Sequence, residues 1–240
     1  MNIVILMAGS SQDFIDKGHF YPKYLLEIQN EPIIQRVINS LSEIGGSLSF
    51  IIQKEDNEKF FLGNAIKILA PESSVIVVES LTKGAVCTML FAIDQINNEN
   101  ELLILNGDQL IRRDINEALD NFRKRDLDGG IVVFRSVHPR WSYVVLDESD
   151  LVMQTSEKRP ISNIAAAGCY YYKKGSDFVR SALSVIRKDV NYQGNYYTSS
   201  TYNELILEQK KIGVYEIPKD NYISFSSYQM YENYLNHRKD

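Results

Sequence analysis

The N-terminal stretch Asn2-Ile3-Val4-Ile5-Leu6-Met7-Ala8-Gly9-Ser10-Ser11 predicts a buried β-strand that opens into a loop of small residues. Its apolar run is continuous rather than alternating, which is typical of a strand covered on both faces of a parallel sheet. Similar runs recur at residues 48–53, 74–79 and 102–106, and each leads into a segment with helical spacing. The first half of the chain therefore predicts a largely parallel sheet with helices on both faces.

Helices are expected after these strands, at residues 32–44, 55–69, 84–97 and 114–125. In the first of them Asn30 is a candidate N-cap, Pro32 fits the first turn, and Gly45-Gly46 ends the apolar repeat. Residues 1–128 thus form four successive β-α units.

Beyond Gly129-Gly130 the pattern changes to strands joined by short polar turns, at residues 131–137, 143–146, 151–157 and 165–172. Helical spacing returns at residues 176–187, 201–211 and 227–238, with a strand at 213–217. Because no Pro-, Gly- or Ser-rich linker separates the halves, we expect a single α/β domain over residues 1–240. Its central sheet is expected to be mixed but mostly parallel, with a smaller antiparallel lobe in residues 129–240.

Composition and charge exclude several classes of protein. The 240 residues are 44% hydrophobic and 24% charged, which is typical of a globular domain and unlike disordered or fibrous chains. The net charge of −5, without a long basic run, argues against a nucleic-acid partner. The apolar N-terminal run is too short for membrane insertion or a signal peptide, and only Cys87 and Cys169 are cysteines, so we expect a cytoplasmic protein.

Three segments carry residues that fit phosphate and metal chemistry. The loop Ala8-Gly9-Ser10-Ser11 lets backbone N–H groups approach a phosphate closely. Lys23 follows Pro22 on a rigid turn and is a candidate phosphate contact, although a lysine is more often a solvated surface residue. Asp108 follows the fourth strand and is a candidate Mg²⁺ ligand, the alternative being a turn or a helix cap. Since ligands of open α/β sheets lie outside the carboxyl ends of the strands, the loop and Asp108 are expected to face one site.

Seven motifs occur in one order along roughly residues 3 to 210, and together they are more specific than any one of them. They are Met7-Ala8-Gly9-Ser10-Ser11, Tyr21-Pro22-Lys23-Tyr24-Leu25-Leu26-Glu27-Ile28, Glu31-Pro32-Ile33-Ile34, Thr82-Lys83-Gly84-Ala85, Asn106-Gly107-Asp108, Glu157-Lys158 and Ala167-Gly168-Cys169-Tyr170. In this order the chain resembles the sugar-phosphate nucleotidyltransferase family. The resemblance implies a Rossmann-like α/β/α sandwich.

The resemblance also implies a reaction, in which a nucleoside monophosphate passes from a nucleoside triphosphate to a phosphorylated small molecule and pyrophosphate is released. The implied nucleotide is CTP, UTP or dTTP, the implied acceptor is a sugar 1-phosphate, and the implied use is surface polysaccharide or capsule assembly. Lys23 and Asp108 are the implied catalytic residues, with Asp108 the ligand of a Mg²⁺ cofactor. The implied nucleotide-binding residues lie in residues 1–128: Leu6, Ala8, Gly9, Ser10, Ser11, Lys83, Gly84 and Gly107. The implied acceptor-binding residues lie in residues 129–240: Trp141, Glu157, Lys158 and Gly168.

The chain departs from the family's pattern in three places. Gln12-Asp13-Phe14 follows the first loop, where the family usually carries an arginine. Ser224 stands where a second metal-binding aspartate is usual, which leaves Asp220, another acid or a water for that place. Asn195 stands where a glutamate is usual ahead of the following tyrosines.

Other functions stay open on the sequence. A cytidylyltransferase acting on a non-sugar phosphate, such as phosphocholine or phosphoglutamine, fits the same motifs. A glycosyltransferase would be expected to show Asp-x-Asp where Asn106-Gly107-Asp108 stands. A catalytically silent nucleotide- or sugar-phosphate-binding protein fits the departures in the first loop and at Ser224.

Two further segments have alternative interpretations. His138-Pro139-Arg140-Trp141 is either a wall of the acceptor site, with Arg140 as a second anion contact, or a turn whose tryptophan packs on the sheet. The C-terminal third holds 12 of the 15 tyrosines, which serve the core or a homodimer contact.

Overall fold

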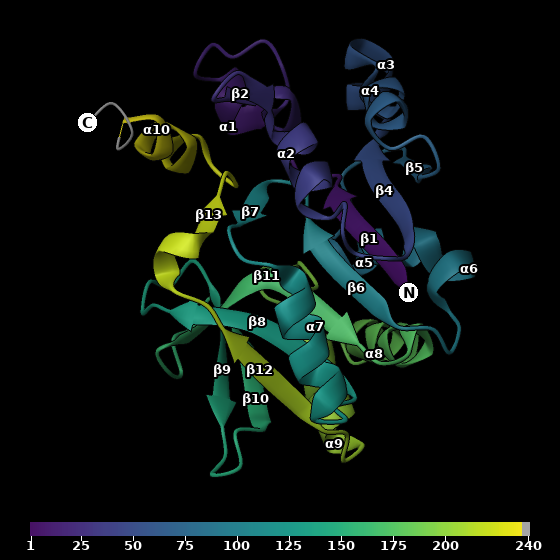
Figure 1. The fold of residues 1–240 in the computed structure, drawn as a ribbon, viewed down its shortest axis with the longest axis vertical. Helices are drawn as coiled ribbons and strands as arrows, with labels where there is room; N and C mark the ends of the chain where they lie inside the picture. The colour runs from purple at the N-terminus through teal and green to yellow at the C-terminus, as the bar shows by residue number, and fades with distance from the viewer. Residues whose placement is uncertain (237–240) are drawn as a thin grey trace.

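The computed structural model describes residues 1–236, which fold around one nine-stranded sheet (Figure 1). Four of its strands run parallel in the spatial order β5-β4-β1-β6. Their bounds are β1 (Asn2–Met7), β4 (Ser47–Gln53), β5 (Ser74–Val78) and β6 (Leu102–Asn106). The predicted parallel half is confirmed, and β1 lies inside it with its carboxyl end beside those of β4 and β6.

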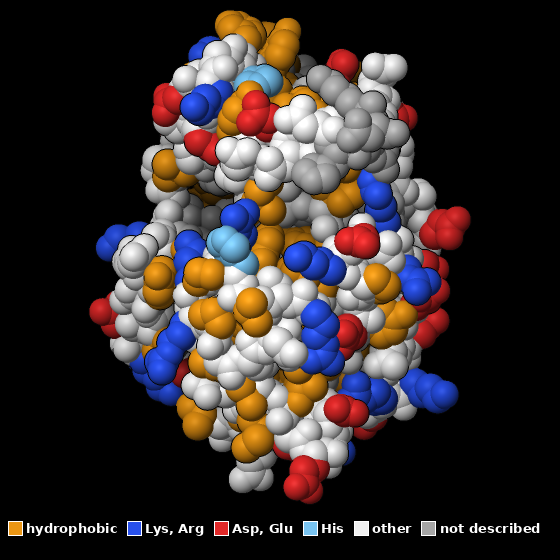
Figure 2. All heavy atoms as spheres, turned by 90° about the vertical axis from the view of Figure 1, so that its left-hand side faces the viewer, with side chains coloured by type: hydrophobic (Ala, Val, Ile, Leu, Met, Phe, Trp, Pro, Cys, Tyr) orange, Lys and Arg blue, Asp and Glu red, His pale blue; other side chains and the backbone are white. Residues whose placement is uncertain are grey.

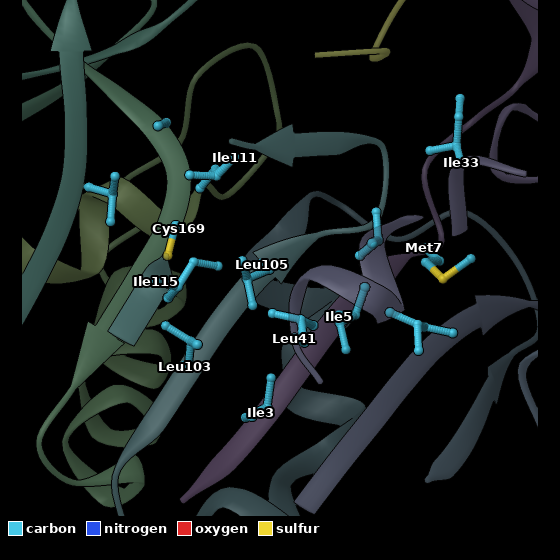
Figure 3. Packing of buried hydrophobic residues seen from close by; sticks show 14 of the residues in the cluster. Ile3, Ile5, Met7, Ile33, Leu41, Leu103, Leu105, Ile111, Ile115 and Cys169 are labelled. Carbon is cyan, nitrogen blue, oxygen red and sulfur yellow. The ribbon is translucent and has the colours of Figure 1, made fainter. Parts of the chain in front are cut away.

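Helices cover both faces of the parallel half because side chains alternate along each strand. Ile3, Ile5 and Met7 of β1 belong to the core on one face, together with residues of α2 (Ile33–Ser40) and α7 (Ile115–Lys124). Figure 3 shows these three side chains pointing into that layer. Val4 and Leu6 belong to the core on the other face, with residues of α5 (Ala85–Met89) and α8 (Gly175–Arg187). A continuous apolar strand is therefore needed to fill both layers, and the predicted α/β/α sandwich is confirmed.

The second half of the sheet is mainly antiparallel. Its strands are β8 (Gly129–Arg135), β9 (Ser142–Leu146), β10 (Val152–Glu157), β11 (Ile164–Tyr172) and β12 (Ile212–Glu216). Residues 169–172 of β11 pair with β6, whereas Ala165 of the same strand pairs with β9. Between these pairings β11 is bulged, and Gly168 there has a positive φ of 61°. The ends of β6 and β9 therefore separate at the bulge of β11, next to the carboxyl end of β6.

The remaining strands form two small antiparallel sheets. They are formed by β2 (Glu27–Ile28) with β3 (Glu31–Pro32) and by β7 (Gln109–Ile111) with β13 (Tyr222–Ser224). The other helical segments are α1 (Gln12–Ile15), η1 (Lys23–Leu25), α3 (Lys54–Phe60), α4 (Leu62–Leu69), η2 (Leu90–Ala92), α6 (Ile93–Ile96), α9 (Thr198–Leu207), η3 (Lys219–Asn221) and α10 (Tyr228–Asn236). None of the helices within residues 1–236 combines the length and the apolar character needed to cross a membrane.

Several expected helices differ from the structure. Asn30 is not an N-cap: it has a positive φ in the turn between β2 and β3, so that α2 begins only at Ile33. The helix expected at 55–69 is broken at Phe61, which has a φ of 54°, and the side chain of Asn57 accepts a hydrogen bond from the N–H of Gly63 beyond the break. The helix expected at 84–97 is divided into α5, η2 and α6.

The other differences are shifts of element ends. The helix expected at 201–211 is α9, which starts at Thr198 and ends at Leu207. The end of the last expected helix, at Arg238, lies outside the described residues. The strand expected at 131–137 begins two residues earlier, at Gly129, because Gly129 and Gly130 are part of β8. A Cβ on Gly130 would lie 2.5 Å from the ring of Phe122, so this glycine permits close packing rather than marking a turn.

Candidate functional site

An ion pair between Lys23 and Asp108 lies where β1 and β6 end. The Nζ atom of Lys23 is 2.7 Å from Oδ2 of Asp108. The backbone N–H of Lys23 donates to the hydroxyl of Ser11 at 3.2 Å, which fixes the lysine against the first loop. Gly107 precedes Asp108, and its N–H donates to the carbonyl oxygen of Leu6 at 2.8 Å. The structure thus brings the first loop, Lys23 and Asp108 together, although they are far apart in sequence.

Lys23 carries a fixed positive charge in this setting, where its exposed fraction is only 5%. Burial is the largest single effect and lowers the pKa of its ammonium, but the attraction and hydrogen bond of the Asp108 carboxylate, together with smaller effects of Tyr24 and Asp13, outweigh burial. The pKa of Lys23 therefore lies above its ordinary value. Tyr24, also buried, accepts a hydrogen bond from the N–H of Gly9 at 3.2 Å through its hydroxyl. A protonated lysine beside exposed loop backbone is suited to neutralising a phosphate.

The residues of the first loop are placed in different ways. Gly9 and Ser10 are exposed, whereas the side chains of Leu6 and Ala8 are buried against α5 and can offer a ligand only their backbone. The hydroxyl of Ser10 accepts from the N–H of Gln12 at 3.1 Å. A Cβ at Gly9 would lie 3.3 Å from Nζ of Lys23, so a larger residue there would crowd the lysine.

The segment with Lys83 and Gly84 is held by the backbone of Tyr196. The carbonyl oxygen of Lys83 accepts from the N–H of Tyr196 at 2.8 Å, and the N–H of Val86 donates to the carbonyl oxygen of Tyr196 at 3.1 Å. Gly84 has a φ of 95°, and a Cβ there would lie 2.5 Å from that same oxygen. The glycine is therefore required by both its conformation and its close approach, while the side chain of Lys83 is exposed.

A cavity of about 610 Å³, here called cavity A, opens at the bulge of β11 beside Asp108. All four predicted acceptor residues line it: Trp141, Glu157, Lys158 and Gly168. Other lining residues come from α5, β6, β9 and the loop before it, β11, the start of α9, β13, and α10 with the segment before it: Ala85, Asn106, His138, Arg140, Ser142, Ala166, Tyr170, Tyr197, Thr198, Tyr222, Ser224, Ser226, Ser227, Gln229 and Met230. Residues from both halves of the chain thus surround one cavity.

Glu157 and Lys158 present opposite charges to cavity A. Oε2 of Glu157 accepts hydrogen bonds from the hydroxyls of Ser142 and of Ser199, the latter at 3.0 Å. Burial raises the pKa of Glu157, and these hydrogen bonds offset only part of that effect. Nζ of Lys158 donates to the hydroxyl of Tyr197 at 3.0 Å and lies 5.1 Å from the centroid of that ring. This pair can bind a ligand that carries both a hydroxyl group and an anion.

Trp141 follows a turn and also packs on the sheet. The ring of Trp141 contacts those of Phe134 and Tyr222, with centroids 5.5 Å apart in both pairs. The guanidinium carbon of Arg140 lies 5.8 Å from the centroid of the Trp141 ring. A second cavity of about 660 Å³, cavity B, lies across Trp141 and Tyr222 and is lined by Arg112, Lys219 and Asp220 among others. Figure 2 shows this side of the molecule hollowed at mid-height, with Lys and Arg side chains around the hollow. Trp141 packs on the sheet, as one interpretation of its segment expects, and it also lines cavity A.

The donors around Asp108 fit a metal ion that binds largely through its substrate. Within residues 1–236 no group of three His, Cys, Asp or Glu side chains is placed to hold a metal. Asp220 lines cavity B and is not among the residues that line cavity A. Ser224 and Ser226 supply hydroxyls at cavity A, and the N–H of Phe225 between them donates to the carbonyl oxygen of Asp108 at 2.7 Å. One carboxylate with hydroxyls, waters and substrate phosphates is a donor set that Mg²⁺ accepts.

The contacts of Ser142, Ser199 and Tyr197 were not expected from the sequence. The register of β9 and β10 places Ser142 directly opposite Glu157, so strand pairing was the one signal for it. Ser199 and Tyr197 reach the site from the start of α9, some 40 residues away in sequence, and no local pattern marks them.

Comparisons with known proteins identify the family and agree with the fold. A family model described as nucleotidyl transferase matches residues 3–221. The bifunctional protein GlmU of Thermoanaerobacter pseudethanolicus is 23% identical over 234 residues, which cover 93% of this chain and 48% of the relative. The chain therefore spans about half the length of the curated relatives it matches.

Solved structures share the fold at low sequence identity. The nucleoside-diphosphate-sugar pyrophosphorylase from Vibrio cholerae RC9 has a TM-score of 0.83 at 22% identity, covering 98% of this chain and 99% of the other. A putative glucose-1-phosphate thymidylyltransferase from Bacillus anthracis, solved with a sucrose, has a TM-score of 0.77 at 17% identity, covering 100% and 96%.

Proposed function

Because the chain belongs to the nucleotidyl transferase family, we propose that it transfers a nucleoside monophosphate from a triphosphate to a phosphorylated small molecule and releases pyrophosphate. The observation that carries the proposal is the Lys23–Asp108 pair, which stands between the first loop and cavity A. We propose CTP, UTP or dTTP as the nucleotide and a sugar 1-phosphate as the acceptor. Surface polysaccharide or capsule assembly in the cytoplasm is the proposed use.

The two halves of the chain divide the substrates in this proposal. Residues 1–128 bind the triphosphate, through the backbone of Leu6, Ala8, Gly9, Ser10, Ser11, Gly84 and Gly107 and the side chain of Lys83. Residues 129–240 bind the acceptor in cavity A, with Lys158 on its phosphate and Glu157 on a hydroxyl. Trp141 and Gly168 shape the cavity that holds the rest of the acceptor.

The reaction is a single in-line displacement. An oxygen of the acceptor phosphate forms a bond to the α-phosphorus, the bond from that phosphorus to the β-phosphate oxygen breaks, and pyrophosphate leaves with the electron pair. Two anions must meet for this, so catalysis requires positioning and charge neutralisation rather than a covalent intermediate. Lys23 supplies a protonated ammonium at the reacting phosphate, and Lys158 holds the attacking phosphate in line.

Asp108 would hold a Mg²⁺ ion that arrives with the triphosphate, with Ser224 and Ser226 beside it. When bound, the ion neutralises charge on the phosphates. Lys23 meanwhile orients one oxygen of Asp108 at 2.7 Å and keeps the carboxylate in place.

The contacts in cavity A favour a sugar 1-phosphate over phosphocholine. A quaternary ammonium group is usually bound on the open faces of aromatic rings. Here Lys158 lies over Tyr197, and Arg140 lies over Trp141, so two of these faces already carry a cation of the protein itself. An anionic, hydroxyl-bearing acceptor is the better complement.

Thermal unfolding with CTP, UTP, dTTP, GTP and ATP, each with and without Mg²⁺, tests the nucleotide half. A triphosphate at 100 times its dissociation constant should stabilise the fold by about 2.7 kcal/mol. We expect one triphosphate to raise the Tm in a Mg²⁺-dependent way, and this effect to vanish in Asp108→Ala. Stabilisation only by a nucleoside-diphosphate conjugate would instead favour a glycosyltransferase or a silent binding protein.

A further inference from the structure

The side chain of Gln109 ties together three separate segments around cavity A. Gln109 directly follows Asp108 and is only 4% exposed. Its Nε2 donates to the carbonyl oxygen of Gly168 at 2.8 Å. Its Oε1 accepts from Nδ2 of Asn106 at 3.3 Å and from the hydroxyl of Tyr222 at 3.2 Å. One buried amide thus bonds to the end of β6, the bulge of β11 and β13.

Those three partners all line cavity A, whereas Gln109 lies behind them and does not. We propose that Gln109 is a positioning residue, which fixes the wall of the acceptor cavity relative to Asp108. The inference rests on the proposed function, in which Asp108 serves the triphosphate and cavity A holds the acceptor. Gln109 would then set the distance between the two substrates without touching either.

The amide of Gln109 satisfies all three partners. It donates to one carbonyl while accepting from an amide N–H and a hydroxyl, which an aliphatic side chain cannot do and an ionised carboxylate can do only in part. Gly168 is also adapted to it, because a Cβ at that position would overlap Oε1 of Gln109. Buried polar networks that are fully satisfied fix a unique geometry, and a lost partner costs the desolvation of the others.

The network has an intrinsic reporter. Tyr222 holds the amide through its hydroxyl and also packs against Trp141, the one tryptophan of the chain, at a centroid distance of 5.5 Å. Quenching of tryptophan fluorescence by acrylamide therefore measures the order of this wall in the complete chain. The measurement needs neither nucleotide nor acceptor.

The test compares Gln109→Met and Gln109→Glu with the wild type at pH 8 and pH 5. Gln109→Met removes every hydrogen bond, so we expect stronger quenching of Trp141 at both pH values. In Gln109→Glu the ionised carboxyl faces the Gly168 carbonyl and should loosen the wall at pH 8. At pH 5 the protonated carboxyl can donate to that carbonyl, so quenching should return toward the wild-type value.

Other titratable groups near the wall require a matched control. Asp108 adjoins Gln109 in sequence, Glu157 and His138 line the same cavity, and Tyr222 belongs to the network. Gln154→Glu introduces the same acid on β10, where Gln154 is exposed and lines neither cavity A nor cavity B. We expect this variant to quench like the wild type at both pH values.

Substrate measurements separate positioning from a general loss of structure. With glucose 1-phosphate, mannose 1-phosphate and phosphocholine as acceptor probes, Gln109→Met should raise the KM of whichever one is used about tenfold, because a loosened wall binds the acceptor less tightly. The KM of the triphosphate and the Tm shift that it causes should stay at their wild-type values.

Three results would overturn the proposal. The first is wild-type quenching in both Gln109 variants, and the second is the same pH response in Gln154→Glu. The third is loss of the triphosphate-induced Tm shift together with the acceptor effect. If the Gln109 variants do not fold, Tyr222→Phe removes one hydrogen bond of the network and keeps the ring; unchanged quenching there would also reject it. If quenching behaves as expected but the wild type turns over no acceptor, the proposed function fails while the positioning role of Gln109 stands.

Discussion

Replacing Asp108 with asparagine should expose the cost of the buried ammonium of Lys23. The substitution keeps the size of the side chain but removes the charge that lies 2.7 Å from Nζ. Lys23 remains 5% exposed, and no other carboxylate forms an ion pair with it within the described residues. Removing one partner of a buried pair typically costs about 3–5 kcal/mol, because the other charge is left uncompensated.

The magnitude has an upper bound, since the buried lysine can release its proton instead. At about 1.36 kcal/mol per pH unit, deprotonating a group with an ordinary pKa of 10.5 costs about 4.8 kcal/mol at pH 7 and about 2 kcal/mol at pH 9. In the wild type the pKa of Lys23 is raised, so its stabilising contribution is complete at both pH values and is lost only above 10.5. In Asp108→Asn burial becomes the main effect and lowers that pKa against the weaker attraction of Asp13, so the unfolded state binds more protons and stability rises with pH.

Urea unfolding followed by circular dichroism at pH 7 and pH 9 measures the difference. We expect a loss of about 3–5 kcal/mol at pH 7 that shrinks toward about 2 kcal/mol at pH 9. Glu79→Gln is the matched control, because its pair with Lys54 has the similar distance of 2.8 Å but Glu79 is 80% exposed. That variant should unfold like the wild type at both pH values. A loss below about 1 kcal/mol in Asp108→Asn, as for an exposed pair, would refute the reasoning.

Three further substitutions probe the rest of the site. Burial raises the pKa of Glu157, so ionisation of this carboxyl destabilises the folded state as pH rises. Glu157→Gln should therefore keep or raise the Tm at pH 7 while weakening acceptor binding in calorimetry. Gly84→Ala should lose clearly more stability than Gly194→Ala. Both positions have a positive φ, which costs alanine about 1–2 kcal/mol, but only the Cβ at position 84 would also lie 2.5 Å from the carbonyl oxygen of Tyr196. Equal losses would contradict this tight contact. In steady-state kinetics Lys158→Met should raise the acceptor KM roughly 10- to 100-fold, as for a lost charge-assisted hydrogen bond, and leave the triphosphate KM unchanged. An equal rise of both KM values would contradict a role of Lys158 in binding the acceptor alone.

Local sequence patterns predicted the sheet because they reflect constraints that tertiary structure does not override. The continuous apolar run of β1 must fill two layers of core, and the glycine at residue 84 is required by its positive φ and a close backbone contact. Where competing contacts decided the conformation, the patterns were insufficient. The turn of Gln29 and Asn30 removes Asn30 from the expected N-cap position of α2, and the left-handed Phe61 breaks a helix that the apolar periodicity predicts to continue.

The candidate site was predictable to the extent that its residues sit at strand ends. The convergence of the first loop with Asp108 follows from a parallel sheet, since the carboxyl ends of β1 and β6 meet at one edge. The hydrogen bonds of Glu157 depend on strand register and on the start of α9, and the placement of Gln109 depends on the bulge at Gly168. Such contacts join segments tens of residues apart, and no local pattern encodes them.

The central claim is tested most directly by pyrophosphate release. The wild-type protein is incubated with Mg²⁺ and each of the five nucleoside triphosphates, alone or with sugar 1-phosphates, phosphocholine or phosphoglutamine. Released pyrophosphate is measured, and the nucleotide products are identified by mass spectrometry. We predict that pyrophosphate appears only when one triphosphate and one phosphorylated acceptor are present together, with an equal amount of the nucleoside-diphosphate conjugate. Binding of a triphosphate without pyrophosphate release for any acceptor would contradict the claim.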